Sequence, residues 1–189
     1  MDTKKIEKAV RMILEAVGAD VSRRDLKATP KRVASMYEEI LSGMKKDASK
    51  EISVILEQTH DEIILLRDIP LYSVCEHHLL PFVGKAYVAY IPDKRITGLS
   101  KIARVVDVLS HKLQVQERLA TEVAAVLMKK LRPKGVMVVI EAEHFCMSMR
   151  GVKKPGTNTV TSVVRGIFRK SSKTRQEALS LMFKKYPTA

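Results

Sequence analysis

The sequence predicts a fold of the α+β class, in which two N-terminal helices precede an antiparallel sheet that is interrupted by two further helices. Three observations support this prediction. Apolar residues recur at helical spacing within the first 43 residues. Short segments rich in β-branched residues begin near residue 62. These segments come in pairs on either side of two helical patterns, and strands that are paired along the chain favour an antiparallel sheet.

The length of 189 residues is enough for one domain with a hydrophobic core and a small helical extension. We expect residues 1–48 to form the N-terminal extension and residues 49–189 to form the main domain. A composition of 46% hydrophobic and 29% charged residues excludes general disorder. No apolar run approaches the roughly 20 residues of a membrane-spanning helix, and the first ten residues lack the apolar core of a signal peptide. We therefore expect a cytoplasmic protein that does not bind membranes.

Two helices are expected at the N-terminus. The first covers residues 2–17, with Gly18 as its stop signal. The second covers residues 28–43, where Thr29 can cap the helix, Pro30 suits its first position and Gly43 can end it. Each has an apolar stripe on one side. The stripes are Ile6, Val10, Ile13, Leu14 and Val17, then Val33, Met36, Tyr37, Ile40 and Leu41.

The rest of the chain alternates between strand and helix patterns after a polar connector at residues 46–51. Strands are expected where β-branched and aromatic residues cluster between turn signals, and helices where apolar residues recur every three to four positions. The expected strands are 62–69, 82–92, 136–149 and 157–168. The expected helices start near residue 100, then cover 117–131 and 174–186.

The basic excess is large, with 34 Lys and Arg against 21 Asp and Glu and a net charge of +13. A nucleic acid, an acidic surface and a highly charged small substrate are the three kinds of partner that this excess allows. The chain has no Lys/Arg tract and only 5% aromatic residues, which weakens the case for single-stranded nucleic acid. We expect most basic side chains to be solvated, a few to line a site, and no nucleic acid to bind.

The two cysteines, Cys75 and Cys146, each lie close to histidines. A disulfide between them is conceivable, but it leaves the histidines unexplained, and a reducing compartment is the better interpretation. In "SVCEHHLLPF" a spacing of three lets Cys75 and His78 converge on one ion in a turn. His77 is one residue out of step with this pair and therefore projects elsewhere.

The segment "AEHFCMS" offers the third metal ligand. If it is a strand, His144 and Cys146 lie side by side at the end of a buried stripe, because alternate residues share a face. Cys146 is the softer ligand, while His144 could ligate instead or stand beside the metal. Three protein ligands leave a position open for water, which is typical of catalytic rather than structural zinc. The simpler alternative is a core cysteine and a hydrogen-bonded structural histidine.

A candidate anion site lies in "ITGLSKIARVV", where Ser100 can cap a helix and Lys101 and Arg104 share a face of its first turn. The helix dipole places about +0.5 of an elementary charge at the N-terminus, which repels cations. A bound anion would explain why two basic residues lie there. Arg150 could reach the same anion. On spacing alone, solvated surface charges remain the simpler interpretation of this cluster.

Glu117, in "QVQERLA", also lies near a helix start, where the helix dipole favours a carboxylate. An ionised carboxylate is an acceptor only, so it could also take two parallel N–H donors from the edge of a guanine base.

Four motifs in order resemble the GTP cyclohydrolase I family: "YSVCEHHLLPFVGKAYVAYIP", "GLSKIARVVD", "QVQERLA" and "EAEHFCMSMRGV". The resemblance covers about residues 29–185 and implies a T-fold catalytic domain in a homodecamer of two pentameric rings, with active sites between subunits. It also implies zinc-dependent hydrolytic opening of the imidazole ring of GTP. Formate and 7,8-dihydroneopterin triphosphate are the products, in the first step towards tetrahydrofolate and other pterins.

The resemblance also assigns roles to single residues. Zinc is held by Cys75, His78 and Cys146, and the catalytic histidines are His77 and His144. Glu117 reads the guanine. The triphosphate is bound by Lys101, Arg104 and Arg150 with Ser100 nearby, and by Arg32 from a neighbouring subunit.

Two other function classes were weighed against this interpretation. A basic nucleic-acid-binding module with structural zinc predicts a fourth ligand and a continuous basic face, and neither is clear in the sequence. A related enzyme of the same fold that acts on another pterin or purine would keep the zinc ligands but alter Glu117 or the phosphate-binding residues, which are all present.

Overall fold

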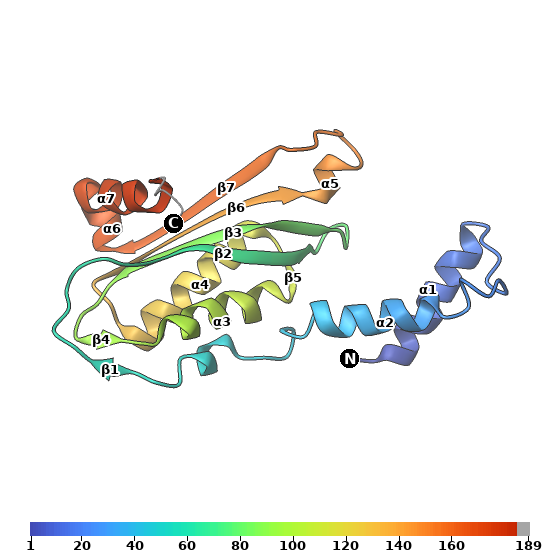
Figure 1. Cartoon of the computed structure of the whole chain (residues 1–189), viewed down its shortest axis with the longest axis horizontal. Helices are drawn as coiled ribbons and strands as arrows, with labels where there is room; N and C mark the ends of the chain where they lie inside the picture. Colours follow the sequence, from blue (N-terminus) through green and yellow to red (C-terminus); the bar gives the residue numbers. More distant parts are fainter. Residues whose placement is uncertain (185–189) are drawn as a thin grey trace, which may run out of the picture.

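The computed structural model describes residues 1–184 and is built around a five-stranded sheet in the order β5–β2–β3–β6–β7 (Figure 1). Each of the four long strands is antiparallel to its neighbours among them, whereas the short β5 runs parallel to β2. The strands are β2 (Ile64–Cys75), β3 (Pro81–Ile91), β5 (Leu113–Gln114), β6 (Gly135–His144) and β7 (Asn158–Gly166). The predicted α+β class and antiparallel sheet are confirmed, while the parallel β5 was not predicted.

Two helices separate the strand pairs in the sequence, as predicted, and cover one face of the sheet (Figure 1). They are α3 (Leu99–Ser110) and α4 (Gln116–Leu131), and their apolar faces fill the main core with side chains from β2, β3 and β6. The other face is covered at one end by α6 (Ile167–Lys170) and α7 (Ser172–Phe183). Residues 185–186 of the expected last helix lie outside the described residues.

Strand β6 is buried on both faces, which explains its nearly continuous apolar sequence. The predicted stripe of Val136, Val138, Ile140 and Ala142 lies in the core beneath α3 and α4. The alternate residues, such as Met137 and Val139, pack against the α6–α7 side. The two faces follow directly from the period of two along a strand.

The N-terminal helices α1 (Thr3–Ala16) and α2 (Thr29–Ile40) pack against each other and extend away from the sheet (Figure 1). The predicted cap at Thr29 is wrong, because Thr29 already lies in the helix, and Ala28 takes the N-cap position without a side-chain hydrogen bond. The predicted stop at Gly43 is also wrong, because the helix ends at Ile40.

Gly43 has a different role, which is close contact with the end of α3. Its N–H donates to the carbonyl of His111 at 2.9 Å, and a Cβ at this position would collide with the carbonyl of Val108. The connector that follows is only partly polar. A short 3-10 helix, η1 (Ala48–Glu51), buries Ala48 in the main core, and Ile52 follows it.

Strand β2 is longer than the predicted segment 62–69 and continues to Cys75. A β-bulge between Leu66 and Ile69 lets the strand absorb Asp68, whose φ is +53° and whose carboxylate accepts a 2.9 Å bond from Lys85. The "RDIP" segment therefore bends the strand rather than ending it. This bend carries Cys75 to the far end of the sheet.

Two peripheral features complete the fold. Strands β1 (Leu56–Glu57) and β4 (Arg95–Ile96) form a separate two-stranded ribbon. Within residues 1–184, the outer edge of β7 pairs with no further strand. None of the helices in this part of the chain combines the length and apolar character that crossing a membrane requires.

We predict that Gly84→Ala destabilises the fold at the centre of the sheet. A Cβ there would overlap the carbonyl of Glu141 and lie 2.7 Å from the Cβ of Ala142, so β3 and β6 would have to separate. The expected loss is about 1–3 kcal/mol, read as a lower thermal midpoint at fixed protein concentration. Gly98→Ser is the control, because the nearest atom to its Cβ is 3.8 Å away. Equal midpoints for the two variants would contradict this packing.

Candidate metal centre and active site

The turn between β2 and β3 brings Cys75 and His78 to one side of the chain. The N–H groups of His78 and Leu79 donate to the Cys75 carbonyl at 3.3 and 2.9 Å, and the Cys75 N–H donates to Leu80 at 2.8 Å. Leu79 closes the turn with a φ of +55°. Pro81 is the first residue of β3, on the far side of this turn.

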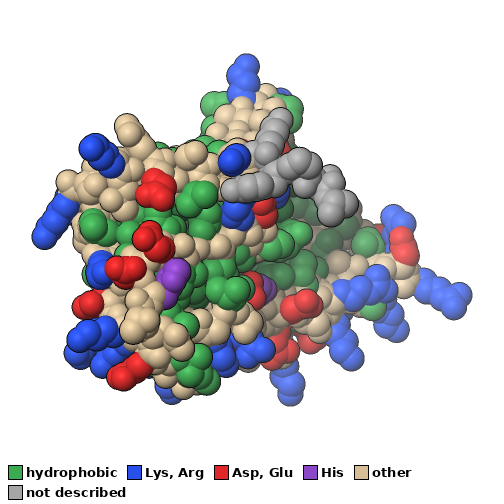
Figure 2. All heavy atoms as spheres, turned by 60° about the vertical axis from the view of Figure 1, so that its left-hand side comes forward, with side chains coloured by type: hydrophobic (Ala, Val, Ile, Leu, Met, Phe, Trp, Pro, Cys, Tyr) green, Lys and Arg blue, Asp and Glu red, His purple; other side chains and the backbone are tan. Residues whose placement is uncertain are grey.

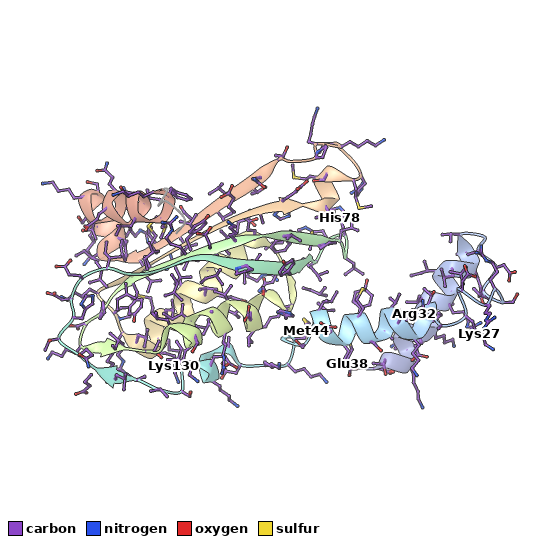
Figure 3. The ribbon with its side chains drawn as sticks, in the orientation of Figure 1. Lys27, Arg32, Glu38, Met44, His78 and Lys130 are labelled. Atoms are coloured by element: carbon purple, nitrogen blue, oxygen red, sulfur yellow. The ribbon has the colours of Figure 1, made fainter. Side chains whose placement is uncertain are left out.

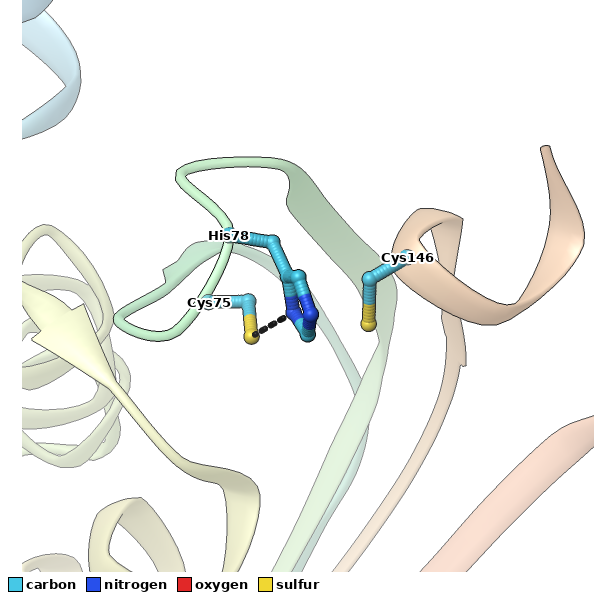
Figure 4. A group of neighbouring side chains, drawn as sticks. All are labelled: Cys75, His78 and Cys146. Carbon is cyan, nitrogen blue, oxygen red and sulfur yellow. Dashed lines mark hydrogen bonds between the residues drawn. The ribbon is translucent and has the colours of Figure 1, made fainter. Parts of the chain in front are cut away.

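Cys75, His78 and Cys146 form a group that could hold a metal ion (Figure 4). Their ligand atoms all lie within 4.8 Å of one another, and Cys75 Sγ is 3.7 Å from His78 Nδ1. Cys75 is only 6% exposed, whereas His78 is exposed. Cys146 reaches the group from α5 (Phe145–Ser148), the short helix that follows β6.

The donor atoms suit a divalent cation. Tetrahedral zinc with a thiolate and an imidazole nitrogen requires a sulfur-to-nitrogen separation of about 3.6 Å, close to the 3.7 Å between Cys75 and His78. Both cysteines are free thiols. Burial, and then the neighbouring Cys75 sulfur, raises the pKa of the Cys146 thiol, and a 2+ ion between the sulfurs would offset both effects.

Cys146 does not lie on a strand beside His144, so that part of the prediction is wrong. Strand β6 ends at His144, and the chain turns at once into α5. The turn carries the Cys146 sulfur to the metal group and leaves His144 beside it. The His144 ring stacks on Phe82, with ring centroids 4.7 Å apart and planes 7° from parallel. His144 therefore stands next to the metal group and is not part of it.

Gln116 fixes the His144 ring and was missed by the sequence analysis. It is 1% exposed, and its Nε2 lies within hydrogen-bond distance of the carbonyls of Ile140 and Thr159 and the hydroxyl of Thr161. Its Oε1 lies 2.8 Å from His144 Nε2. Flipping the amide would turn Oε1 towards two carbonyl oxygens, so Oε1 must accept and His144 Nε2 must carry the proton.

The environment keeps His144 neutral near pH 7. Burial lowers the pKa of His144, against a smaller opposing attraction from Glu117. With its proton on Nε2, the ring has a free lone pair on Nδ1. The sequence shows a glutamine at a helix start, within "QVQERLA", but its burial and its partners are seen only in the structure.

His77 lies outside the metal group, as its position one residue out of step predicts. Its side chain is 64% exposed, and its Nε2 lies 3.7 Å from the carboxylate of Glu76. The His77 and His78 rings meet edge to face, with centroids 6.2 Å apart. Two other predicted residues lie close by. Glu117 is near enough to act on His144, and Arg150 on Cys146, through their charges.

The predicted phosphate-binding residues of α3 lie at its other end. Ser110, the last residue of α3, accepts a 2.7 Å bond from Ser73, two residues before Cys75. Lys101 and Arg104 are nine and six residues earlier, about 14 and 9 Å further along the helix axis. The predicted cap at Ser100 is wrong, because Gly98 is the N-cap residue.

Arg32 is also separated from the metal group. It lies on α2 in the projecting N-terminal part, well away from His78 (Figure 3). A single chain therefore brings one set of predicted site residues together and leaves another set apart. The gathered residues are Cys75, His77, His78, Glu117, His144, Cys146 and Arg150, and the separated ones are Arg32, Ser100, Lys101 and Arg104.

Comparison with known proteins identifies the family. The model of the family described as GTP cyclohydrolase I matches residues 6–183, nearly the whole chain. The chain belongs to the GTP cyclohydrolase I family. The predicted family and the predicted enzyme activity are confirmed by this match and by the relatives below.

Three relatives named GTP cyclohydrolase 1 illustrate the likeness. The protein of Carboxydothermus hydrogenoformans is 59% identical over 96% of this chain and 95% of its own. Those of Pelotomaculum thermopropionicum and Caldanaerobacter subterraneus are 59% and 60% identical, each over 96% of this chain and 97% of its own. Among solved structures, the archaeosine synthase QueF-like in the apo form covers 56% of this chain and 94% of its own, at a TM-score of 0.45 and 15% identity. That structural likeness is too weak to add to the assignment.

We predict that His144 of the metal-loaded enzyme carries its proton on Nε2 at neutral pH, read from the nitrogen shifts of ¹⁵N-labelled histidine. Gln116→Leu removes the acceptor that fixes this tautomer, so a mixture of both tautomers is expected. Gln114→Leu is the matched control, because Gln114 is equally buried but bonds Leu109 and Glu122 instead. An unchanged His144 signal in Gln116→Leu would contradict the assignment.

Proposed function

We propose that the family's reaction takes place beside the group of Cys75, His78 and Cys146, and that zinc is the metal held there. GTP and water would give formate and 7,8-dihydroneopterin triphosphate. The observation that carries this proposal is the convergence of two thiols and one imidazole next to a second, neutral imidazole. Thiolate and imidazole donors favour zinc over the oxygen-seeking magnesium and calcium ions.

The three protein donors leave room for a fourth ligand, as in catalytic rather than structural zinc sites. When bound, the zinc ion supplies Lewis-acid activation of water at neutral pH for attack on C8 of the purine. Cys75 and Cys146 would hold the ion as thiolates, and His78 would hold it through a ring nitrogen.

The two remaining histidines move protons. His77 is exposed beside the metal group and is free to protonate the purine nitrogen next to C8. His144, neutral and with its Nδ1 lone pair free, can take up a proton at the hydrated carbon or at the ribose oxygen. Stacking on Phe82 and the bond to Gln116 limit the motion of His144, so its free nitrogen is pre-positioned.

Substrate recognition uses two charged residues near the metal group. The Glu117 carboxylate accepts the paired N–H donors of the guanine edge, and Arg150 binds the triphosphate near Cys146. The triphosphate does not react. Its binding energy serves to position the ring that does.

We propose that further triphosphate contacts come from neighbouring subunits of a homodecamer. Ser100, Lys101, Arg104 and Arg32 are all distant from the metal group of their own chain, which supports a site shared between chains. The open edge of β7 and the exposed apolar residues Met149, Val152 and Val160 supply surface for such contacts.

The same features support the proposed domain division and the proposed location. Residues 1–48 would act as the helical extension and residues 49–189 as the catalytic domain. In support, the main core begins at this boundary, with Ala48 as its first residue. Two free thiols in a metal group suit the reducing cytoplasm.

The basic surface does not require a nucleic-acid partner. On the face drawn in Figure 2, Lys and Arg side chains are spread around the outline and separated by acidic, apolar and uncharged groups. A nucleic-acid-binding face would instead be expected to carry its cations as a continuous stripe.

We predict that Cys75→Ser and Cys146→Ser each lose bound zinc and GTP turnover together. Losing a direct ligand should lower metal affinity by more than the roughly 10- to 100-fold typical of outer-shell changes. Metal content is measured by elemental analysis, and turnover by formate release and the fluorescence of the oxidised pterin.

His77→Ala is the matched control, because His77 lies on the same turn but outside the metal group. It should keep zinc and lose turnover roughly 10²- to 10⁴-fold, the usual contribution of a proton-transfer group. Zinc loss in this variant would overturn the ligand assignment.

A further prediction concerns the shared site. Cys75→Ser and Lys101→Ala chains, each inactive alone, should regain activity when assembled together. In an equal mixture half of the sites have an intact metal group, and half of those meet an intact Lys101, so roughly one quarter of wild-type activity is expected. Mixing Cys75→Ser with Cys146→Ser is the control and should regain nothing, because both residues serve the same half-site. Equal results for the two mixtures would rule out sharing.

A further inference from the structure

A bidentate ion pair joins helix α4 to the turn that carries Cys75 and His78. Arg118 Nη1 and Nη2 donate to Glu76 Oε2 and Oε1 at 2.7 and 2.6 Å. Arg118 lies in the first turn of α4, and Glu76 lies between Cys75 and His77 in the sequence. A planar guanidinium that meets a carboxylate with two parallel bonds fixes direction as well as distance.

Glu76 is held by its main chain as well. Its N–H donates to the carbonyl of Gln114 at 3.0 Å, so β5 binds the backbone of Glu76 while α4 binds its side chain. The oxygen that accepts from Arg118 Nη2 is also the one that lies 3.7 Å from His77 Nε2. The His77 ring thus has the anchored carboxylate beside it, and it meets the His78 ring edge to face.

We propose that Arg118 and Glu76 are positioning residues that set the place and orientation of His77 relative to the metal group. The inference rests on the proposed catalytic role of His77. Arg118 fixes the orientation of the Glu76 carboxylate, and the carboxylate attracts Nε2 of the His77 ring. Neither residue needs to touch the substrate.

The same turn of α4 also controls the other histidine. Gln116 bonds His144, and Arg118 reaches Glu76 and through it His77, while Glu117 stands between them in the sequence. One helical turn therefore sets both imidazoles relative to the carboxylate proposed to read guanine. This arrangement explains why three consecutive polar residues with different partners open α4.

A structural role alone does not account for the pair. The side chains of Arg118 and Glu76 are 43% and 29% exposed, and ion pairs with this much solvent contribute little to folding. Misplacing a reacting group by about 1 Å, in contrast, can lower a rate by roughly 100-fold. Loss of the pair should therefore be seen in turnover and hardly in stability.

The test is Arg118→Met in the full-length, zinc-loaded enzyme. We expect kcat to fall about 10- to 100-fold, with zinc content unchanged, KM for GTP within about threefold of wild type and the thermal midpoint nearly unchanged. Arg118→Lys keeps the charge but loses the bidentate geometry, so its kcat should lie between those of Arg118→Met and the wild type. Lys129→Met removes an exposed charge from the other end of α4 and is the control, with wild-type kcat expected.

A double-mutant cycle with His77→Ala separates this inference from the proposed function. If Arg118 acts through His77, Arg118→Met should add less than about twofold to the loss already caused by His77→Ala. Full additivity of the two losses, loss of zinc in Arg118→Met, or a kcat within twofold of wild type would each overturn the inference. Wild-type turnover in His77→Ala would instead overturn the catalytic role of His77 itself.

Discussion

The pairing of β3 with a strand on each side is the constraint on which the site depends. Phe82, the second residue of β3, faces Ser73 of β2 and His144 of β6 in the same ladder. The end of β2 that leads to Cys75 and the end of β6 that leads to Cys146 therefore lie at the same edge of the sheet, on either side of Phe82. A slip of one residue in either register would turn every side chain to the other face and separate the two thiols.

The start of α4 supplies the second constraint, because it fixes ring orientations that the sheet leaves open. Gln116 is a buried amide whose polar atoms are shared among β6, β7 and His144, so it cannot rotate without leaving carbonyl groups unpaired. The sheet sets where the metal group lies, and α4 sets how the neighbouring side chains face it. Sheet packing and proton chemistry are thereby linked through one helix end.

Local patterns in the sequence were sufficient for part of this arrangement. The spacing of Cys75 and His78 indicates a shared ion because the two lie in one turn, and the alternation in residues 136–142 indicates a buried face because a strand has a period of two. The Gly98 cap and the early end of α2 at Ile40 were missed, since several residues near each helix end could serve and tertiary contacts choose among them.

Other features depend on contacts that no local pattern contains. The segment "HFCMS" is apolar enough to continue a strand. The helical turn that forms there instead brings the Cys146 sulfur close to that of Cys75, and the position of Cys75 is known only from the structure. The acceptors of Gln116 lie 24 to 45 residues away in the sequence. The distance of Lys101 from its own metal group likewise depends on the direction in which α3 crosses the sheet.

The outer edge of β7, which pairs with no strand within residues 1–184, has a consequence for a newly made chain. In this strand of nine residues, alternate residues direct their backbone N–H and C=O groups outward, away from β6, and another extended peptide could pair with them. Folding of each chain therefore competes with aggregation through this edge, and aggregation becomes faster as the protein concentration rises. The yield of folded enzyme thus depends on the concentration at which the chain folds, as well as on the stability of the folded chain.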